Sequence, residues 1–257
     1  MTIESVENNS TLFLTVLGGI MPNISNKGHS GKEAAAREAL KLVETGMIIG
    51  LGTGSTAKIF VDLLAQKYFE ESLNIEVLAT SSSTANQAQK LGLPLTSINN
   101  VERVDLVIDG ADEVDPLLNL IKGGGGALLQ EKIVAESGKV MVVIVDDSKI
   151  VTNLGRFPLP IEIIKFGYDF TRKKVLEEIG NLGYLGISSD WRKDGESFFL
   201  TDEGHYILDL KLNHIKNPAL THEKIKGVTG VVETGLFINI ANKVIIGDEE
   251  GNLIEKE

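Results

Sequence analysis

Cysteine is absent from the 257 residues, and histidine occurs only four times. Without cysteine the chain can form no disulfide, no thiolate zinc site and no cysteine nucleophile. The histidines show no zinc-site spacing such as HExxH, so we expect neither a metal site nor a cofactor. The lack of cysteine also fits a reducing compartment, and we expect a cytoplasmic protein.

Basic residues are in the minority. Lys and Arg number 25 against 36 Asp and Glu, which gives a formal net charge of −11, and no block of basic residues occurs. A nucleic acid or an anionic membrane would have to bind against the overall field, and we expect neither as a partner. An anionic substrate must therefore be held by locally placed lysines and backbone amides.

Long hydrophobic runs are also missing. Residues 12–21 are apolar but too few to span a bilayer, and Glu4 and Glu7 stand where a signal peptide would be basic. We expect residues 1–29 to be a disordered N-terminal extension; the alternative is an upstream start codon, with Met21 as a second candidate start. The remaining composition, 42% hydrophobic and 24% charged, is ordinary for a soluble globular protein that can bury a sizeable core.

Strand and helix patterns alternate through the first part of the chain. Short apolar segments typical of buried strands alternate with amphipathic helical segments, and polar clusters follow the strands. We predict an α/β fold with a Rossmann-like, mostly parallel sheet and helices on both faces. The expected strands are 47–51, 75–79, 95–98, 104–108, 139–145 and a returning strand at 243–246, and the expected helices are 32–44 and 56–70.

The pattern changes near Gly155, where a segment with two prolines suggests a domain crossing. We predict a second, smaller α+β domain at 156–228, with 30–155 and 229–257 forming the catalytic α/β domain. The expected elements of the smaller domain are a helix at 172–180, a strand at 184–188, a hairpin at 198–212 around 202–204 and a helix at 218–225. A strand at 228–234 completes this α+β part.

The segment GTGST at 52–56 lies between a predicted strand and a predicted helix. Backbone N–H groups, small hydroxyls and the positive end of a helix dipole would together favour a phosphate there. The alternative is a tight turn with Ser55 as helix cap. A dinucleotide fingerprint does not fit, because Ser55 replaces the third glycine, and a Walker A loop would need a following Gly-Lys. A second run of hydroxyls, TSSST at 80–84, suggests that a polar ligand lies nearby.

Two further segments carry acids, a lysine and bare amides. DGAD at 109–112 follows a buried strand, and KGGGG at 122–126 leads into a helix that carries Glu131. Open α/β sheets bind ligands where their strands end, and a run of glycines lets backbone N–H groups approach a ligand closely. Each segment alone could be an ordinary turn, but together they predict a binding site.

These motifs resemble type A ribose-5-phosphate isomerases. The resemblance includes DDSK at 146–149 and FPLPIEI at 157–163, and it extends from about residue 32 to the C-terminus in the family's order. It implies interconversion of D-ribose 5-phosphate and D-ribulose 5-phosphate through an enediolate, in the non-oxidative pentose phosphate pathway, without a metal. It also implies a homo-oligomer, commonly a dimer or a tetramer, and we expect a dimer.

The resemblance assigns roles to matching residues. Glu131 would be the base that moves a proton between C2 and C1, Lys122 would stabilise developing negative charge, and Asp109 and Asp112 would open the sugar ring and shuttle protons. The implied substrate-binding residues are Lys32, Thr53, Gly54, Ser55, Thr56, Asp109, Gly110, Ala111, Asp112, Lys122, Gly123, Gly124, Gly125 and Lys149.

Two alternatives stay open at this point. One is a related isomerase or deaminase that acts on an amino-sugar phosphate or another phosphosugar. The other is a sugar-phosphate sensor without turnover, although a sensor should carry a DNA-binding module, and the chain shows no basic helix-turn-helix segment.

Deletion of residues 1–29 is expected to leave turnover of ribose 5-phosphate unchanged, because the motifs begin only at about residue 32. Steady-state rates of the truncated and full chains test this. A truncated protein that fails to fold or to turn over would show that the segment is more than an extension.

Overall fold

The computed structural model describes residues 30–257, and the predicted N-terminal extension lies outside them. Its centre is a six-stranded sheet with the strand order β15-β14-β6-β3-β1-β2. All neighbouring strands pair in parallel except β15, which is antiparallel to β14 at the edge. The strands are β1 (Ile48–Leu51), β2 (Glu76–Ala79), β3 (Leu106–Asp109), β6 (Met141–Asp146), β14 (Lys243–Gly247) and β15 (Leu253–Lys256).

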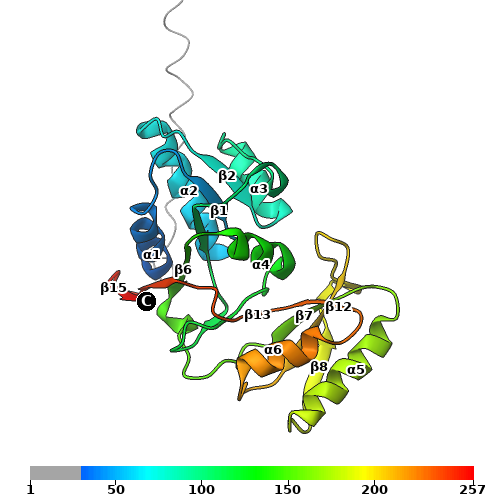
Figure 1. Cartoon of the computed structure of the whole chain (residues 1–257). Helices are drawn as coiled ribbons and strands as arrows, with labels where there is room; N and C mark the ends of the chain where they lie inside the picture. The colour runs from blue at the N-terminus through cyan, green and yellow to red at the C-terminus, as the bar shows by residue number, and fades with distance from the viewer. Residues whose placement is uncertain (1–29) are drawn as a thin grey trace, which may run out of the picture.

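Helices cover both faces of this sheet (Figure 1). Side chains along a strand point alternately to opposite faces, so Leu106 and Ile108 pack on the side of α1, α2 and α3. Val107 packs on the side of α4. The predicted fold class is therefore confirmed. The helices are α1 (Ser30–Leu40), α2 (Ser55–Glu70), α3 (Ser82–Lys90) and α4 (Leu128–Ser137).

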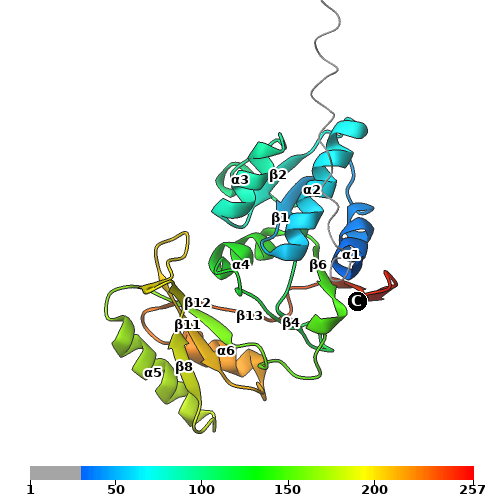
Figure 2. The same ribbon diagram turned by 180° about the vertical axis from the view of Figure 1, so that it is seen from behind.

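A second, antiparallel sheet lies beside the first (Figure 2). Its strand order is β12-β7-β11-β8, and α5 and α6 share an apolar core with one of its faces. Within residues 30–257 no helix combines the length and apolarity needed to cross a membrane. The elements are β7 (Leu159–Ile163), α5 (Tyr168–Asn181), β8 (Ser188–Trp191), β11 (Tyr206–Lys211), α6 (Pro218–Lys226) and β12 (Val231–Thr234).

A small three-stranded sheet connects the two parts. It has the order β13-β5-β4, from β4 (Glu113–Val114), β5 (Leu120–Ile121) and β13 (Leu236–Phe237). After β13 the chain returns to the first sheet, where β14 lies parallel to β6, as predicted. The predicted domain limits stay a prediction; β12, which falls in segment 229–257, pairs with β7 of the four-stranded sheet.

Two predicted β elements are wrong, and the strand predicted at 184–188 lies instead at Ser188–Trp191. Instead of a strand at 95–98, Leu95 forms only an isolated bridge with Val77, and a 3-10 turn, η1 (Ile98–Asn100), follows. Ser97 begins that turn, because its hydroxyl accepts a hydrogen bond from the Asn99 N–H. Instead of a hairpin at 198–212, the short strands β9 (Lys193–Asp194) and β10 (Ser197–Phe198) pair with each other. β11 pairs with β7 and β8, which buries both of its edges.

The segment with two prolines, predicted to be a domain crossing, includes a β-strand. It continues directly into β7, an inner strand of the second sheet. Pro160 is the second residue of β7, and its carbonyl still accepts a hydrogen bond from the Gly235 N–H at 2.7 Å. A proline removes one donor from a ladder, so a position near the start of the strand limits the loss.

Two glycines let α1 approach the first sheet closely. A Cβ atom added at Gly247 would lie 2.0 Å from the Gly31 carbonyl oxygen, and one added at Gly31 would lie 2.5 Å from the Gly247 carbonyl oxygen. Because both obstacles are backbone atoms, neither can move aside alone. This contact places the first turn of α1, with Lys32, beside the end of β6, where Lys32 Nζ lies 3.9 Å from Asp146.

Gly247→Ala is expected to reduce the free energy of unfolding by roughly 1–3 kcal/mol, because α1 must shift away from the sheet. Urea denaturation measures the change. Gly180→Ala is the matched control: Gly180 lies within α5, and a Cβ there would meet nothing within 4 Å, so this change should stabilise by up to about 1 kcal/mol. Equal effects of the two substitutions would contradict the close-contact argument.

Candidate active site

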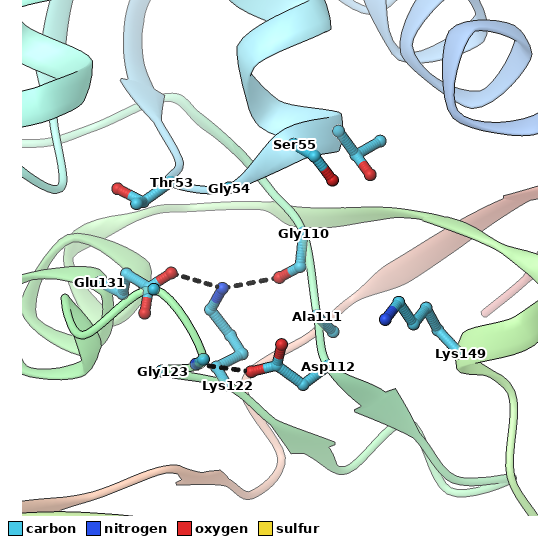
Figure 3. A pocket seen from close by; sticks show the side chains of 13 residues that line it. Thr53, Gly54, Ser55, Gly110, Ala111, Asp112, Lys122, Gly123, Glu131 and Lys149 are labelled. Atoms are coloured by element: carbon cyan, nitrogen blue, oxygen red, sulfur yellow. Dashed lines mark hydrogen bonds and ion pairs between the residues drawn. The ribbon is translucent and has the colours of Figure 1, made fainter. Parts of the chain in front are cut away.

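A small polar cavity lies where β1 and β3 end. β2 lies on one side of β1 in the sheet, and β3, the next strand along the chain, lies on the other side of β1. The strand order therefore reverses at the ends of β1 and β3, and open α/β sheets bind ligands at such a switch point. The cavity has a volume of about 90 Å³. Its lining is formed by Thr53, Gly54, Ser55, Thr56, Gly110, Ala111, Asp112, Lys122, Gly123, Gly124, Gly125, Glu131 and Lys149 (Figure 3).

A buried ammonium group forms the floor of this cavity. Lys122 Nζ lies 2.9 Å from Asp109 Oδ2 and 2.9 Å from Glu131 Oε1, and it donates to the Gly110 carbonyl at 2.6 Å. The Lys122 side chain is only 2% exposed, and the two carboxylates are equally well buried. A buried charge is tolerated when it is paired and fully hydrogen-bonded, and here one cation is shared between two acids.

The shared cation leaves the cluster with an excess of negative charge. Burial raises the pKa of Glu131 to about 7; Lys122 opposes that shift, and Asp109 adds to it. Burial also raises the pKa of Asp109, again against the effect of Lys122. For Lys122 itself, burial lowers the pKa, but the two carboxylates outweigh burial and raise it. The lysine therefore stays charged while Glu131 can exchange a proton near neutral pH.

Glu131 lies in the first turn of α4 and has one free oxygen. Its Oε1 is bound to Lys122, whereas Oε2 is buried and has no hydrogen-bond partner among the described residues. The next residue, Lys132, fixes the helix: its Nζ donates to Glu233 Oε1 and to the carbonyls of Thr234 and Leu236 at 2.7–2.8 Å. A held carboxylate with one unpaired oxygen in a polar cavity can act as a proton acceptor.

The opposite side of the cavity is suited to an anion. Gly54, with φ +116°, precedes α2, and within residues 30–257 no side chain caps that helix. The backbone N–H groups of its first turn are therefore open to a ligand. Ser55 is not the cap; its hydroxyl accepts from Lys32 Nζ at 3.0 Å, and Lys149 also lines the cavity (Figure 3).

The second hydroxyl run is structural. Thr53 Oγ1 lies within 2.7–3.2 Å of the hydroxyls of Thr80, Ser81 and Thr84, and Ser81 caps α3 by accepting from the Thr84 N–H. None of residues 80–84 lines the cavity. The hydroxyls therefore hold Thr53 in place, and the structure gives no support to a ligand bound directly to them.

Twelve of the fourteen residues implied by the resemblance as binding residues line the cavity, the exceptions being Asp109 and Lys32. Asp109 lies behind Lys122, where its Oδ1 accepts from the N–H groups of Thr53 and Gly110. Lys32 reaches the cavity only through Ser55. Asp112 does line it, and its Oδ2 accepts from the Gly124 N–H at 2.8 Å.

Two supporting residues were missed from the sequence. They are Lys132 and Arg192, neither of which belongs to the motifs that predict the site. Arg192 follows β8, and its side chain reaches the glycine loop at Gly123. No local signal could have found this contact, because 69 residues separate the two. The neighbouring Trp191 ring contacts Tyr168, Phe198 and Tyr206.

The chain is similar in sequence to ribose 5-phosphate isomerases. The sequence model of ribose 5-phosphate isomerase A (phosphoriboisomerase A) matches residues 76–251. Ribose-5-phosphate isomerase A of Cereibacter sphaeroides is 46% identical over 237 residues, which are 92% of this chain and 95% of that protein. The protein of the same name from Dinoroseobacter shibae is 47% identical over 86% of this chain and 85% of its own length.

Solved structures of ribose 5-phosphate isomerases are also similar to this chain in fold. Ribose 5-phosphate isomerase A from Methanocaldococcus jannaschii superposes with a TM-score of 0.80 at 37% identity, over 88% of this chain and 98% of that chain. The Plasmodium falciparum enzyme gives 0.83 at 36% identity, over 88% and 97%. A D-ribose-5-phosphate isomerase in complex with phospho-erythronic acid gives 0.81 at 35% identity, over 91% and 100%.

The raised pKa of Glu131 predicts a pH dependence of stability. Between its ordinary value of 4.5 and about 7, the folded chain keeps a proton on Glu131 that the unfolded chain releases. The free energy of unfolding should therefore fall as pH rises through this window, and Asp109 adds to the same slope. Urea denaturation at several pH values should show a shallower slope for Glu131→Gln. Glu136→Gln, on the exposed side of α4, should keep the original slope, and an unchanged slope in Glu131→Gln would contradict the prediction.

Proposed function

The chain belongs to the ribose 5-phosphate isomerase A family, and on that premise we propose how its residues interconvert D-ribose 5-phosphate and D-ribulose 5-phosphate. The reaction is an aldose–ketose isomerisation. It moves one proton from C2 to C1 and one from the C2 hydroxyl to the C1 oxygen, through an enediolate. The assignment of roles rests mainly on Glu131, which lines the cavity. It is a buried acid with a pKa of about 7, and one of its carboxylate oxygens has no hydrogen-bond partner among the described residues.

Glu131 is the base in this proposal. Its Oε2 takes the proton from C2 and returns it to C1, so one carboxylate on one face of the sugar serves both carbons. A base works best when its pKa lies near the operating pH. Burial and the negative charge of Asp109 raise the pKa of Glu131 to that range. The hydrogen bond from Lys122 holds Oε1 in place and leaves Oε2 for the substrate.

Lys122 stabilises the charge that develops on the substrate oxygens. Its raised pKa keeps it cationic throughout the cycle, and a fixed cation in a water-poor site acts strongly on a nearby oxyanion. The amides of the glycine loop that line the cavity add hydrogen-bond donors. Loss of a single donor of this kind typically costs about 10²- to 10³-fold in rate.

The two aspartates have different surroundings, which supports different roles. Asp112 reaches the cavity and can exchange a proton with the ring oxygen or a hydroxyl when the furanose opens. Asp109 is completely buried beside Lys122 and accepts from two backbone N–H groups. It acts by holding Lys122 charged and in place.

The phosphate binds at the other end of the cavity. The start of α2 offers the amides of Gly54 to Thr56 and the hydroxyls of Ser55 and Thr56, and Lys149 adds a positive charge. Lys32 contributes through Ser55, whose hydroxyl it orients. A phosphate dianion on a protein with a net charge of −11 requires such local positive potential.

We further propose that the enzyme is a cytoplasmic homodimer of the non-oxidative pentose phosphate branch. The absence of cysteine supports the reducing compartment. The sequence similarity to the family, for which a homo-oligomer is expected, supports the dimer.

Glu131→Gln is expected to lower kcat by roughly 10²- to 10⁴-fold, because the amide keeps the shape but cannot accept the proton. The measurement is ribulose 5-phosphate formed from ribose 5-phosphate in the presence of EDTA. In the unmodified enzyme, kcat/KM should rise with pH and level off above an apparent pKa near 7. Glu136→Gln is the matched control on the same helix and should retain full activity. Near-full activity of Glu131→Gln would move the base to Asp112.

A further inference from the structure

Arg192 joins the second sheet to the glycine loop of the active site. One terminal nitrogen of its guanidinium, Nη1, donates to the carbonyl oxygens of both Gly123 and Gly124, at 2.7 and 3.0 Å. The other two nitrogens, Nε and Nη2, donate to the two carboxylate oxygens of Asp209, at 3.0 and 2.6 Å. Arg192 does not line the cavity, so it touches the loop from outside.

The contact helps to fix which way two successive peptide groups face, alongside the Gly126 N–H, which donates to the Gly123 carbonyl at 2.9 Å. In a trans peptide the C=O and N–H bonds point in opposite directions, and no cis peptide occurs in residues 30–257. The Gly123 carbonyl points to Arg192, and the N–H of the same peptide, on Gly124, points to Asp112 on the cavity side. The Gly124 carbonyl points to the same Arg192 nitrogen, so the Gly125 N–H must also turn toward the cavity.

The Gly125 N–H is available to a ligand. It has no hydrogen-bond partner among the described residues, and Gly125 lines the cavity. Gly123, at the start of the glycine loop, and Glu131 lie on one side of the cavity, whereas Ser55 and Lys149 lie on the other (Figure 3). A Cβ atom added at Gly125 would lie 3.6 Å from the Thr53 methyl carbon, and the hydroxyl and N–H of Thr53 are bound within the protein. The amide is therefore placed for oxygens at the reacting end of the sugar and away from the phosphate.

Arginine suits this position better than lysine. Its planar guanidinium can bind a carboxylate through two nitrogens and still donate from the third nitrogen to carbonyl oxygens. Asp209 lies on β11, between β7 and β8, and both charged side chains are largely buried, at 16% and 19% exposed. The second sheet thus contacts the four-glycine loop through one anchored side chain.

We propose that Arg192, held by Asp209, is a positioning residue for the isomerisation: it turns the Gly125 N–H toward the oxyanion of the enediolate. The proposal rests on the function proposed above. A donor of this kind binds the charged intermediate more strongly than the neutral substrate. Loss of Arg192 should therefore affect kcat more than KM, and it should leave the phosphate end of the cavity untouched.

The test compares Arg192→Met and Arg192→Lys with the unmodified enzyme. Arg192→Met is expected to lower kcat by about 10- to 10²-fold with KM changed less than about threefold, because the donor is misdirected but not removed. Arg192→Lys should recover part of the loss. Arg172→Met is the matched control, because Arg172 is also half-buried in the second part of the chain but bonds only Ser189, and it should keep kcat.

A binding measurement makes the test independent of turnover. Calorimetric titration with 4-phospho-D-erythronate, whose carboxylate resembles the enediolate oxygens, should show a loss of affinity in Arg192→Met that parallels the loss of kcat. Affinity for inorganic phosphate should stay within about twofold. Asp209→Asn should show the same pattern more weakly, because the arginine loses its charged anchor.

Equal affinity of Arg192→Met and unmodified enzyme for 4-phospho-D-erythronate would overturn the proposal. A parallel loss of inorganic phosphate affinity would overturn it too, because the defect would then be general. If the unmodified enzyme binds 4-phospho-D-erythronate but converts no ribose 5-phosphate, the proposed function fails, and the two titrations still decide whether Arg192 positions the amide. If Arg192→Met does not fold, Arg192→Lys and Asp209→Asn decide in the same assays.

Discussion

The sharing of one buried ammonium group between two buried carboxylates is the interaction on which the active site depends. Lys122 meets Asp109, Glu131 and the Gly110 carbonyl, each within 3 Å. Removing such charges from water costs several kcal/mol each, and one cation cannot fully offset two anions. The imbalance is what raises the pKa of Glu131 toward neutrality while Lys122 remains charged. The same arrangement that is costly for folding supplies an acid–base group of useful strength.

The surrounding structure holds this cluster from two directions. From the first sheet, β3 delivers Asp109 and β1 delivers the Thr53 N–H that binds it. On the side of the second sheet, the chain from the end of β12 to the start of β13 binds both lysines through backbone carbonyls. The Gly235 carbonyl accepts from the Lys122 backbone N–H, and the carbonyls of Thr234 and Leu236 accept from Lys132 Nζ. The Phe237 ring lies 5.6 Å from the Lys122 ammonium and 4.8 Å from that of Lys132. The reaction centre is therefore built where the two parts of the chain meet.

Backbone groups form much of the cavity lining, which explains the glycines. A side chain at Gly52 would lie 2.1 Å from Asp109 Oδ1, and one at Gly124 would lie 2.5 Å from Asp112 Oδ1. Gly123 and Gly126 have positive φ angles of 97° and 86°, which side chains disfavour. A loop of bare amides can surround a small phosphosugar closely, but it has no packing of its own to fix it. Arg192 and Asp112 bind the two sides of one of its peptides.

The sequence by itself determined the parallel sheet, the positions of its main strands and most of the residues at the cavity, because these depend on local information. Continuous apolar segments such as 139–145 form strands buried on both faces, and strand ends in a parallel sheet meet at one edge, so DGAD and GTGST had to lie near each other. Only the tertiary structure decided that Asp109 lies behind Lys122 while Asp112 faces the cavity, and that the hydroxyls of 80–84 hold Thr53. It alone brought Arg192 to Gly123 and Lys132 to Glu233. Those contacts join residues far apart in the chain, and they depend on how two sheets pack, which no local pattern of side chains encodes.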